Sequence, residues 1–145
     1  MTTATSPPAA RRTPHYESLD DVLHDAEQLA AGPVAMVGGW SFGQVMTHLA
    51  GAINYSIDGF PKPLPAPVRT VMRLFFKNRF LTKPLPAGFK TVKSDPNLSP
   101  GATDTEAGLE SLRSAIARYR SETRRALHPV LGPLTSAEWE QFHLR

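Results

Sequence analysis

Apolar side chains recur every three or four residues over most of the chain after residue 17, a spacing typical of amphipathic α-helices. The first predicted helix begins after the cap Ser18 and stops at Gly32-Pro33. The second begins after Ser41, which has capping-box spacing to Gln44, and stops at residues 58–61. Their expected core stripes are Leu19, Val22, Leu23, Ala26, Leu29 and Ala30, and then Phe42, Val45, Met46, Leu49 and Ile53.

Three further helical segments follow. Residues 68–81 are strongly apolar with interleaved Arg and Lys, which predicts a helix that docks on the bundle or presents a surface to a partner. Residues 82–102 hold four Pro and two Gly, and predict a long surface connection. Capping-box pairs then open two helices, the last of which reaches the C-terminus without a stop signal and is expected to be incomplete. These pairs are Thr103 with Glu106, and Thr135 with Glu138.

Together these elements predict an all-α protein with one helical-bundle domain. The domain is expected at residues 17–145, and a disordered leader rich in Thr, Ala, Pro and Arg at residues 1–16. A chain of 145 residues can bury a core without disulfides or metal staples.

Composition narrows the chemistry. The absence of cysteine excludes disulfides, thiol nucleophiles and thiolate zinc sites, so any metal would be held by His, Asp or Glu. No apolar stretch is long enough to span a bilayer, and we expect no membrane partner. Arg11-Arg12 is not followed by the apolar segment of an export signal, which predicts a cytoplasmic protein.

Charge gives only a weak indication of partners. The net charge is +3, and the basic residues are spread over several segments, with acidic residues among most of them. The two densest groups resemble solvated helix faces more than a nucleic-acid motif, so no nucleic-acid partner is expected. They are Arg69, Arg73, Lys77 and Arg79, and Arg118, Arg120, Arg124 and Arg125.

Among the five histidines, His48 has the most unusual position. His15 lies in the leader, His24 lies among polar positions, and His128 lies in a Pro-flanked turn where it is expected to cap helical carbonyls. His48 belongs to a stripe beside the apolar one, where small residues would leave room in a bundle interior; the stripe is Ser41, Gln44, His48, Gly51, Ala52 and Tyr55. Spacing alone leaves two interpretations of His48, a hydrogen-bonded core residue or a metal ligand.

Several motifs resemble the uncharacterised DUF1569 family of the DinB/YfiT-like superfamily. The resemblance is carried by GWSFGQVMTHLA at 39–50, YSIDGFP at 55–61, PAGF at 86–89, HPVLGPLT at 128–135, Trp139 and FHLR at 142–145. It implies an up-down four-helix bundle with an extra helical segment and a long loop, and a homodimer. It also implies a divalent metal, Zn or Ni, held by three histidines.

The resemblance also assigns the metal ligands. His48 matches the ligand from the second helix. The other two belong to an H-x-x-x-H pair that would begin directly after Arg145, and one helical turn would place both imidazoles on one face. His143 precedes that pair and is a weaker candidate.

Two functions from different classes follow. The first is a metal-dependent thiol transferase or hydrolase acting on an unknown small molecule, with Gln44 or Tyr55 near the open coordination position and Trp40 lining the pocket. The alternative is a non-catalytic binding or dimerisation bundle without metal, in which the apolar segment at residues 68–81 forms the contact surface.

Overall fold

The computed structural model describes residues 10–85 and 93–145, and these residues form five helices. They are α1 Leu19–Ala30, α2 Phe42–Asp58, α3 Ala66–Thr82, α4 Thr105–Ser121 and α5 Ser136–His143. The only β-type pairing among the described residues is an isolated bridge between His128 and Gly132. The all-α prediction is therefore confirmed for this part of the chain.

Three of the helices begin where local capping chemistry predicts. Ser18, Ser41 and Thr135 each accept a hydrogen bond from the backbone N–H three residues later, and the side chain at that position returns a bond to the cap. The start predicted for α4 is wrong by one or two residues. Asp104 caps α4 by accepting from Ala107 N–H at 2.8 Å, while the Thr103 hydroxyl donates to the Gly101 carbonyl instead.

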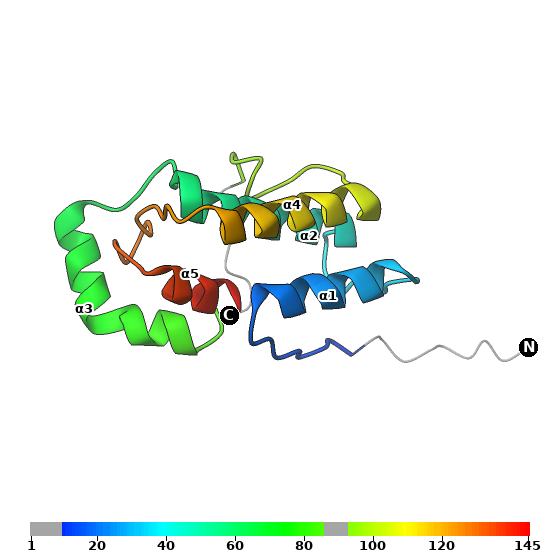
Figure 1. Ribbon diagram of the computed structural model, residues 1–145, viewed down its shortest axis with the longest axis horizontal. Coiled ribbons are helices and arrows are strands. Elements are labelled where there is room, and N and C mark those ends of the chain that lie inside the picture. Colours follow the sequence, from blue (N-terminus) through cyan, green and yellow to red (C-terminus); the bar gives the residue numbers. More distant parts are fainter. Residues whose placement is uncertain (1–9, 86–92) are drawn as a thin grey trace, which may run out of the picture.

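Helices α2 and α4 lie side by side and run in the same direction (Figure 1). Near their N-termini Gly43 meets Gly108, where a Cβ on Gly108 would lie 2.4 Å from the Gly43 carbonyl oxygen. Near their C-termini the Arg118 guanidinium binds the Asp58 carboxylate at 2.6 Å. Helix α1 runs antiparallel to α4, since Glu27 pairs with Arg113 and Asp20 with Arg120.

The core lies between α1, α2, α4 and α5. Trp139 of α5 is fully buried and its indole N–H donates to the Ala126 carbonyl at 3.2 Å. Each predicted stripe contributes two buried residues, Leu19 and Ala26 of α1 and Met46 and Ile53 of α2. The other members of the stripes are only half-buried, namely Val22, Leu23, Leu29, Ala30, Phe42, Val45 and Leu49. The buried apolar cluster is Leu19, Ala26, Met46, Ala50, Ile53, Ile57, Leu112, Ala115, Ile116, Tyr119, Leu131, Leu134 and Trp139.

Helix α3 lies at one end of the molecule, beside α5 (Figure 1). It begins two residues before the predicted start, with Pro67 in its first turn, where a missing N–H costs nothing. Its inner side packs Met72 and Phe80 against the core, and Leu81 is buried. No helix in the described residues is long and apolar enough to cross a membrane.

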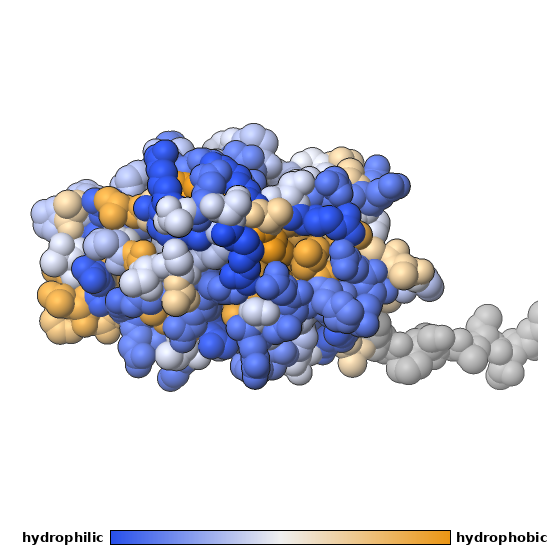
Figure 2. Space-filling view, in the orientation of Figure 1, coloured by the Kyte–Doolittle hydropathy of each residue, from blue (hydrophilic) through white to orange (hydrophobic). Residues whose placement is uncertain are grey.

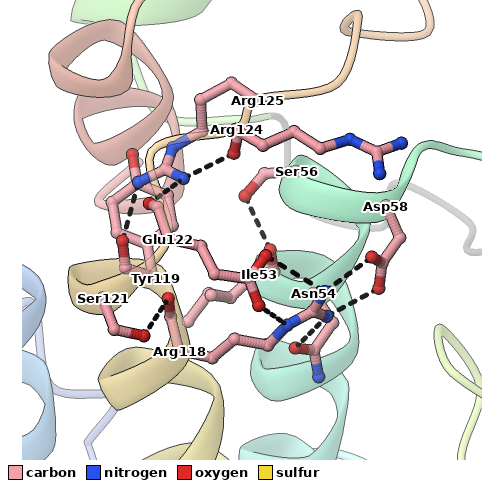
Figure 3. A network of polar contacts seen from close by, with 10 residues as sticks. All are labelled: Ile53, Asn54, Ser56, Asp58, Arg118, Tyr119, Ser121, Glu122, Arg124 and Arg125. Carbon is pink, nitrogen blue, oxygen red and sulfur yellow. Dashed lines mark hydrogen bonds and ion pairs between the residues drawn. The ribbon is translucent and has the colours of Figure 1, made fainter.

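The C-terminal end of α4 is held by arginines for which the sequence predicted a solvated face (Figure 3). Arg118 joins Asp58 and Glu122, and it holds the pKa of Asp58 below its usual range through their hydrogen bonds. Arg125 donates to the Tyr119 and Glu122 carbonyls at 2.7 and 2.8 Å, and so caps the last turn of α4. These side chains are structural rather than free charges.

Part of the predicted leader makes contacts with α1. Arg12 and the Tyr16 hydroxyl both bind the Asp25 carboxylate, at 2.9 and 2.6 Å. Residues 1–9 lie outside the described part of the chain, so the disordered leader stays a prediction.

Candidate functional site

The polar stripe on α2 is covered by a loop segment, residues 95–103, which runs antiparallel to the helix. Contacts follow in order along both segments. The loop begins with a turn, in which the Asp95 carbonyl accepts hydrogen bonds from the Leu98 and Ser99 N–H groups at 3.1 and 2.7 Å. The contacts are Ser41 Oγ to the Thr103 carbonyl (3.2 Å), Gln44 Nε2 to the Pro100 carbonyl (3.0 Å), His48 Nδ1 to the Leu98 carbonyl (2.8 Å) and Tyr55 Oη to the Asp95 carboxylate (2.7 Å).

Glycines on α2 allow this close approach. A Cβ on Gly51 would lie 2.1 Å from the Asn97 carbonyl oxygen, and one on Gly43 would lie 2.2 Å from that of Thr103. Both atoms belong to backbone, which cannot rotate away as a flexible side chain can. The room that Gly51 was expected to leave for a ligand is therefore occupied by the backbone of residues 95–103.

His48 is half-buried between this segment and Trp40. Its Nδ1 lies 2.8 Å from the Leu98 carbonyl oxygen, which can only accept, so Nδ1 carries the proton in the neutral ring. Nε2 is then the nitrogen with a free lone pair. The Trp40 ring lies 5.2 Å from the imidazole, with the two planes tilted by 57°. His48 is thus hydrogen-bonded through Nδ1, as the first interpretation expects. Its Nε2 has the lone pair that the second interpretation, a metal ligand, requires.

Tyr55 and Gln44, two further predicted site residues, both anchor the loop segment. The Tyr55 hydroxyl donates to Asp95 and accepts from Asn97 Nδ2 at 3.0 Å. The Asn97 amide lowers the pKa of Tyr55, but lost hydration and the Asp95 carboxylate outweigh it, and the net change is upward. Gln44 uses its Oε1 for the Ser41 cap and its Nε2 for Pro100. These polar atoms of both side chains are therefore hydrogen-bonded within the protein.

A second group of histidines lies in an aromatic cluster that the sequence did not predict. His128 Nδ1 accepts hydrogen bonds from the Val130 and Leu131 N–H groups, both at 3.1 Å, so it organises its own turn and does not cap helical carbonyls as predicted. Burial lowers the pKa of His128 to about 4. The spacing of His-Pro and Gly-Pro signals a turn but says nothing about this burial.

His143 belongs to the same cluster. Its ring stacks on Trp139 with centroids 5.6 Å apart, and burial lowers its pKa to about 4. Its Nε2 atom is buried without a hydrogen-bond partner among the described residues.

The described residues do not bring three metal-binding side chains together. His48 contacts Trp40 and Leu98, whereas the rings around His143 are Tyr119, Trp139 and Phe142. The two predicted histidine ligands therefore have no ring or hydrogen-bond partner in common. His48 provides one imidazole that could bind a metal, and the described residues place no two further ligands beside it.

A groove of about 480 Å³ lies next to this stripe, over the α2–α4 pair. Small residues of both helices line it, namely Ala50 and Gly51 of α2 and Ala115 of α4, together with Asn97 of the loop segment and Arg118 of α4. The groove is open, has both polar and apolar lining residues, and shares the loop segment with His48.

Comparison with known families gives one match. The family described as "Protein of unknown function (DUF1569)" matches residues 9–145. No curated protein and no solved structure matches the chain.

Proposed function

The chain belongs to the DUF1569 family, and from that premise we propose that it is a metal-binding helical protein in which His48 Nε2 is one of the protein ligands. The observation that carries this proposal is the hydrogen bond from His48 Nδ1–H to the Leu98 carbonyl. Histidines that bind metals commonly donate their other ring N–H to a carbonyl or carboxylate, which fixes the tautomer and the ring orientation. His48 has this arrangement already.

The donor set fits a metal in part. One imidazole binds Zn²⁺ or Ni²⁺ weakly against water, because such sites use three or four protein ligands. We expect the two further ligands in the H-x-x-x-H pair that the resemblance places after Arg145. A bound divalent ion would supply Lewis-acid chemistry, which suits the thiol transferase or hydrolase that the resemblance implies.

Two experiments test this ligand set. The DNA directly downstream of codon 145 should continue in frame and encode His-x-x-x-His, and a stop codon at that point would contradict the proposal. The protein encoded by that longer frame should purify with stoichiometric metal by elemental analysis. His48→Ala should then lower the metal affinity more than about tenfold. Loss of a group that only orients a metal ligand already costs about 10- to 100-fold, and His48 would be a ligand itself. His24→Ala is the matched control, since His24 is an exposed histidine on α1.

A second candidate function is favoured by a different observation. Five large apolar side chains of α3 are exposed, namely Val68, Val71, Leu74, Phe75 and Phe76. Contiguous exposed apolar surface marks interaction sites. We therefore also propose a non-catalytic binding bundle that acts through α3. Metal-free purified protein that still binds a partner through α3 would support this candidate over the first.

Three finer expectations stay predictions. They are a DinB-like up-down four-helix bundle whose last helix is incomplete, a homodimer and a cytoplasmic location. Size-exclusion chromatography with light scattering measures the oligomeric state, and a concentration-independent monomer would contradict the homodimer.

A further inference from the structure

A second groove, of about 650 Å³, lies between α3 and the turn that precedes α5. One wall is the side of α3 that faces the protein, and the other is formed by Leu131, Gly132 and Pro133. The two walls approach closely, since a Cβ on Gly132 would lie 4.0 Å from the Cβ of Arg69. The volume lies within the range of small-ligand sites, about 300 to 1,000 Å³.

Backbone hydrogen bonds form the turn and join it to α3. Two of them link His128 and Gly132, at 2.7 and 2.9 Å, and close the turn. The N–H of Leu64, just before α3, donates to the Pro129 carbonyl at 2.8 Å. The start of α3 is therefore tied to the turn, and the groove between them is part of the folded protein.

Three cations from successive turns of α3 line this groove, namely Arg69, Arg73 and Lys77. Steps of four residues keep them on one side of the helix, with a rise of about 6 Å between neighbours. Lys77 forms an ion pair with Glu138 of α5. Arg69 and Arg73 have no carboxylate partner among the described residues, and α3 itself contains no Asp or Glu. Two positive charges at the groove are therefore unpaired in this part of the chain.

The outward face of α3 has a different character. Val68, Val71 and Phe75 are exposed there, and Figure 2 shows apolar side chains gathered at the end of the molecule formed by α3. The helical spacing places this face opposite the three cations. The sequence predicted a solvated helix face for these cations, whereas the structure places them along a groove.

Charge and geometry indicate which ligand suits the groove. Two unpaired guanidinium groups match a group with about two negative charges, which a phosphate monoester carries near pH 7. Guanidinium forks bind phosphate oxygens bidentately, and a terminal phosphoryl group offers three such oxygens. A carboxylate, a sulfate monoester or a phosphodiester has a single charge and matches the pair less well. Leu74 and Pro133 also line the groove and provide apolar surface for an organic substituent.

We propose that the groove between α3 and residues 131–133 binds an organic phosphate monoester, with its phosphoryl group held between Arg69 and Arg73. This inference goes beyond both candidate functions above. It concerns neither the metal site at His48 nor the outward face of α3.

Titration calorimetry with phenyl phosphate tests the proposal, in buffer with EDTA so that bound metal does not contribute. Phenyl sulfate is the matched probe, because it has the same ring and one negative charge. Phenyl phosphate should bind about tenfold more tightly than phenyl sulfate. Arg73→Gln should lower the affinity for phenyl phosphate about tenfold, because it removes a charged donor. Arg73→Lys keeps the charge without the fork and should recover only part of the affinity.

Two control variants separate a groove from general attraction by charge. Arg124→Gln removes an exposed arginine that does not line the groove, and it should leave the affinity unchanged. Glu138→Gln removes the carboxylate that pairs with Lys77, and it should raise the affinity about threefold. Glutamine can still complete the capping box with Thr135, so α5 should be retained. A gain in affinity cannot result from misfolding.

Three results would overturn the proposal. One is the absence of phenyl phosphate binding to the unsubstituted protein, by calorimetry and by ³¹P NMR. Another is an equal loss of affinity in Arg73→Gln and Arg124→Gln, or a loss in Glu138→Gln. The third is a ligand of another class, seen as an oligonucleotide that binds more tightly than phenyl phosphate and depends on Arg73. His48→Ala should leave phenyl phosphate binding unchanged, which separates this proposal from the metal site.

Discussion

Gly51→Ala should destabilise the protein although it introduces a better helix former. Gly51 lies in the interior of α2, where Gly to Ala normally stabilises by about 1 kcal/mol. Here the new methyl group would meet the Asn97 carbonyl oxygen at 2.1 Å. Residues 95–103 would have to move away from α2, so the sign of the effect reports whether that segment lies there.

The magnitude follows from the bonds that this movement breaks. The neutral hydrogen bond from His48 to the Leu98 carbonyl contributes about 1 kcal/mol, and the bond from Tyr55 to the Asp95 carboxylate about 2 kcal/mol. The Asn97 N–H is itself held by Asp95 at 2.9 Å, so the segment cannot yield locally without losing a further bond. After subtracting the gain in helix propensity, we expect a net loss of about 2 kcal/mol.

Urea unfolding followed by circular dichroism measures this change. Gly101→Ala is the matched control, because Gly101 lies in the same segment, a methyl group there would meet nothing beyond its chain neighbours within 4 Å, and its backbone is not left-handed. It should change the free energy of unfolding by less than about 0.5 kcal/mol. A Gly51→Ala protein more stable than the unsubstituted one would refute the packing of residues 95–103 on α2.

Three further predictions concern stability. Tyr55→Phe removes the hydroxyl between Asp95 and Asn97 and should cost about 1 to 3 kcal/mol in urea unfolding, whereas no change would contradict the anchor. Burial holds the pKa of His128 at about 4, against 6.5 in the unfolded chain, so between these values the unfolded state binds more protons. From pH 6.5 to 4 His128 alone should therefore lower stability by up to about 3 kcal/mol, and His143, whose pKa is also about 4, should add to the fall. His128→Asn, which keeps an acceptor, should reduce the slope and leave the contribution of His143; an unchanged slope would refute the assignment. Arg118→Gln should lower the melting temperature, with a smaller difference in concentrated salt, because its ion pairs with Asp58 and Glu122 are partly exposed.

Local chemistry explains what the sequence could predict. Ser18, Ser41 and Thr135 cap their helices through atoms three residues away, so short-range spacing contains the needed information. The prediction of Thr103 as a cap is wrong because Asp104 offers a competing carboxylate one residue later. Such boundaries depend on which of two neighbouring side chains reaches the same backbone N–H groups.

Tertiary contacts explain what it could not predict. In the sequence, Gly51 predicts spare volume beside the second helix. The backbone that fills this volume belongs to Asn97, 46 positions later, and helical spacing contains no information about it. His128 indicates only a turn, because its burial depends on rings from α3 and α5 such as Phe80 and Phe142.

The tautomer of His48 tests the central claim most directly. Long-range ¹H–¹⁵N NMR in alkaline buffer distinguishes a proton on Nδ1 from one on Nε2. The hydrogen bond to the Leu98 carbonyl predicts the Nδ1–H form. In the protein encoded by the longer frame, added Zn²⁺ should then shift the Nε2 resonance of His48 more than that of the exposed His24. An Nε2–H form of His48, or equal shifts at both histidines, would contradict a ligand held ready on α2.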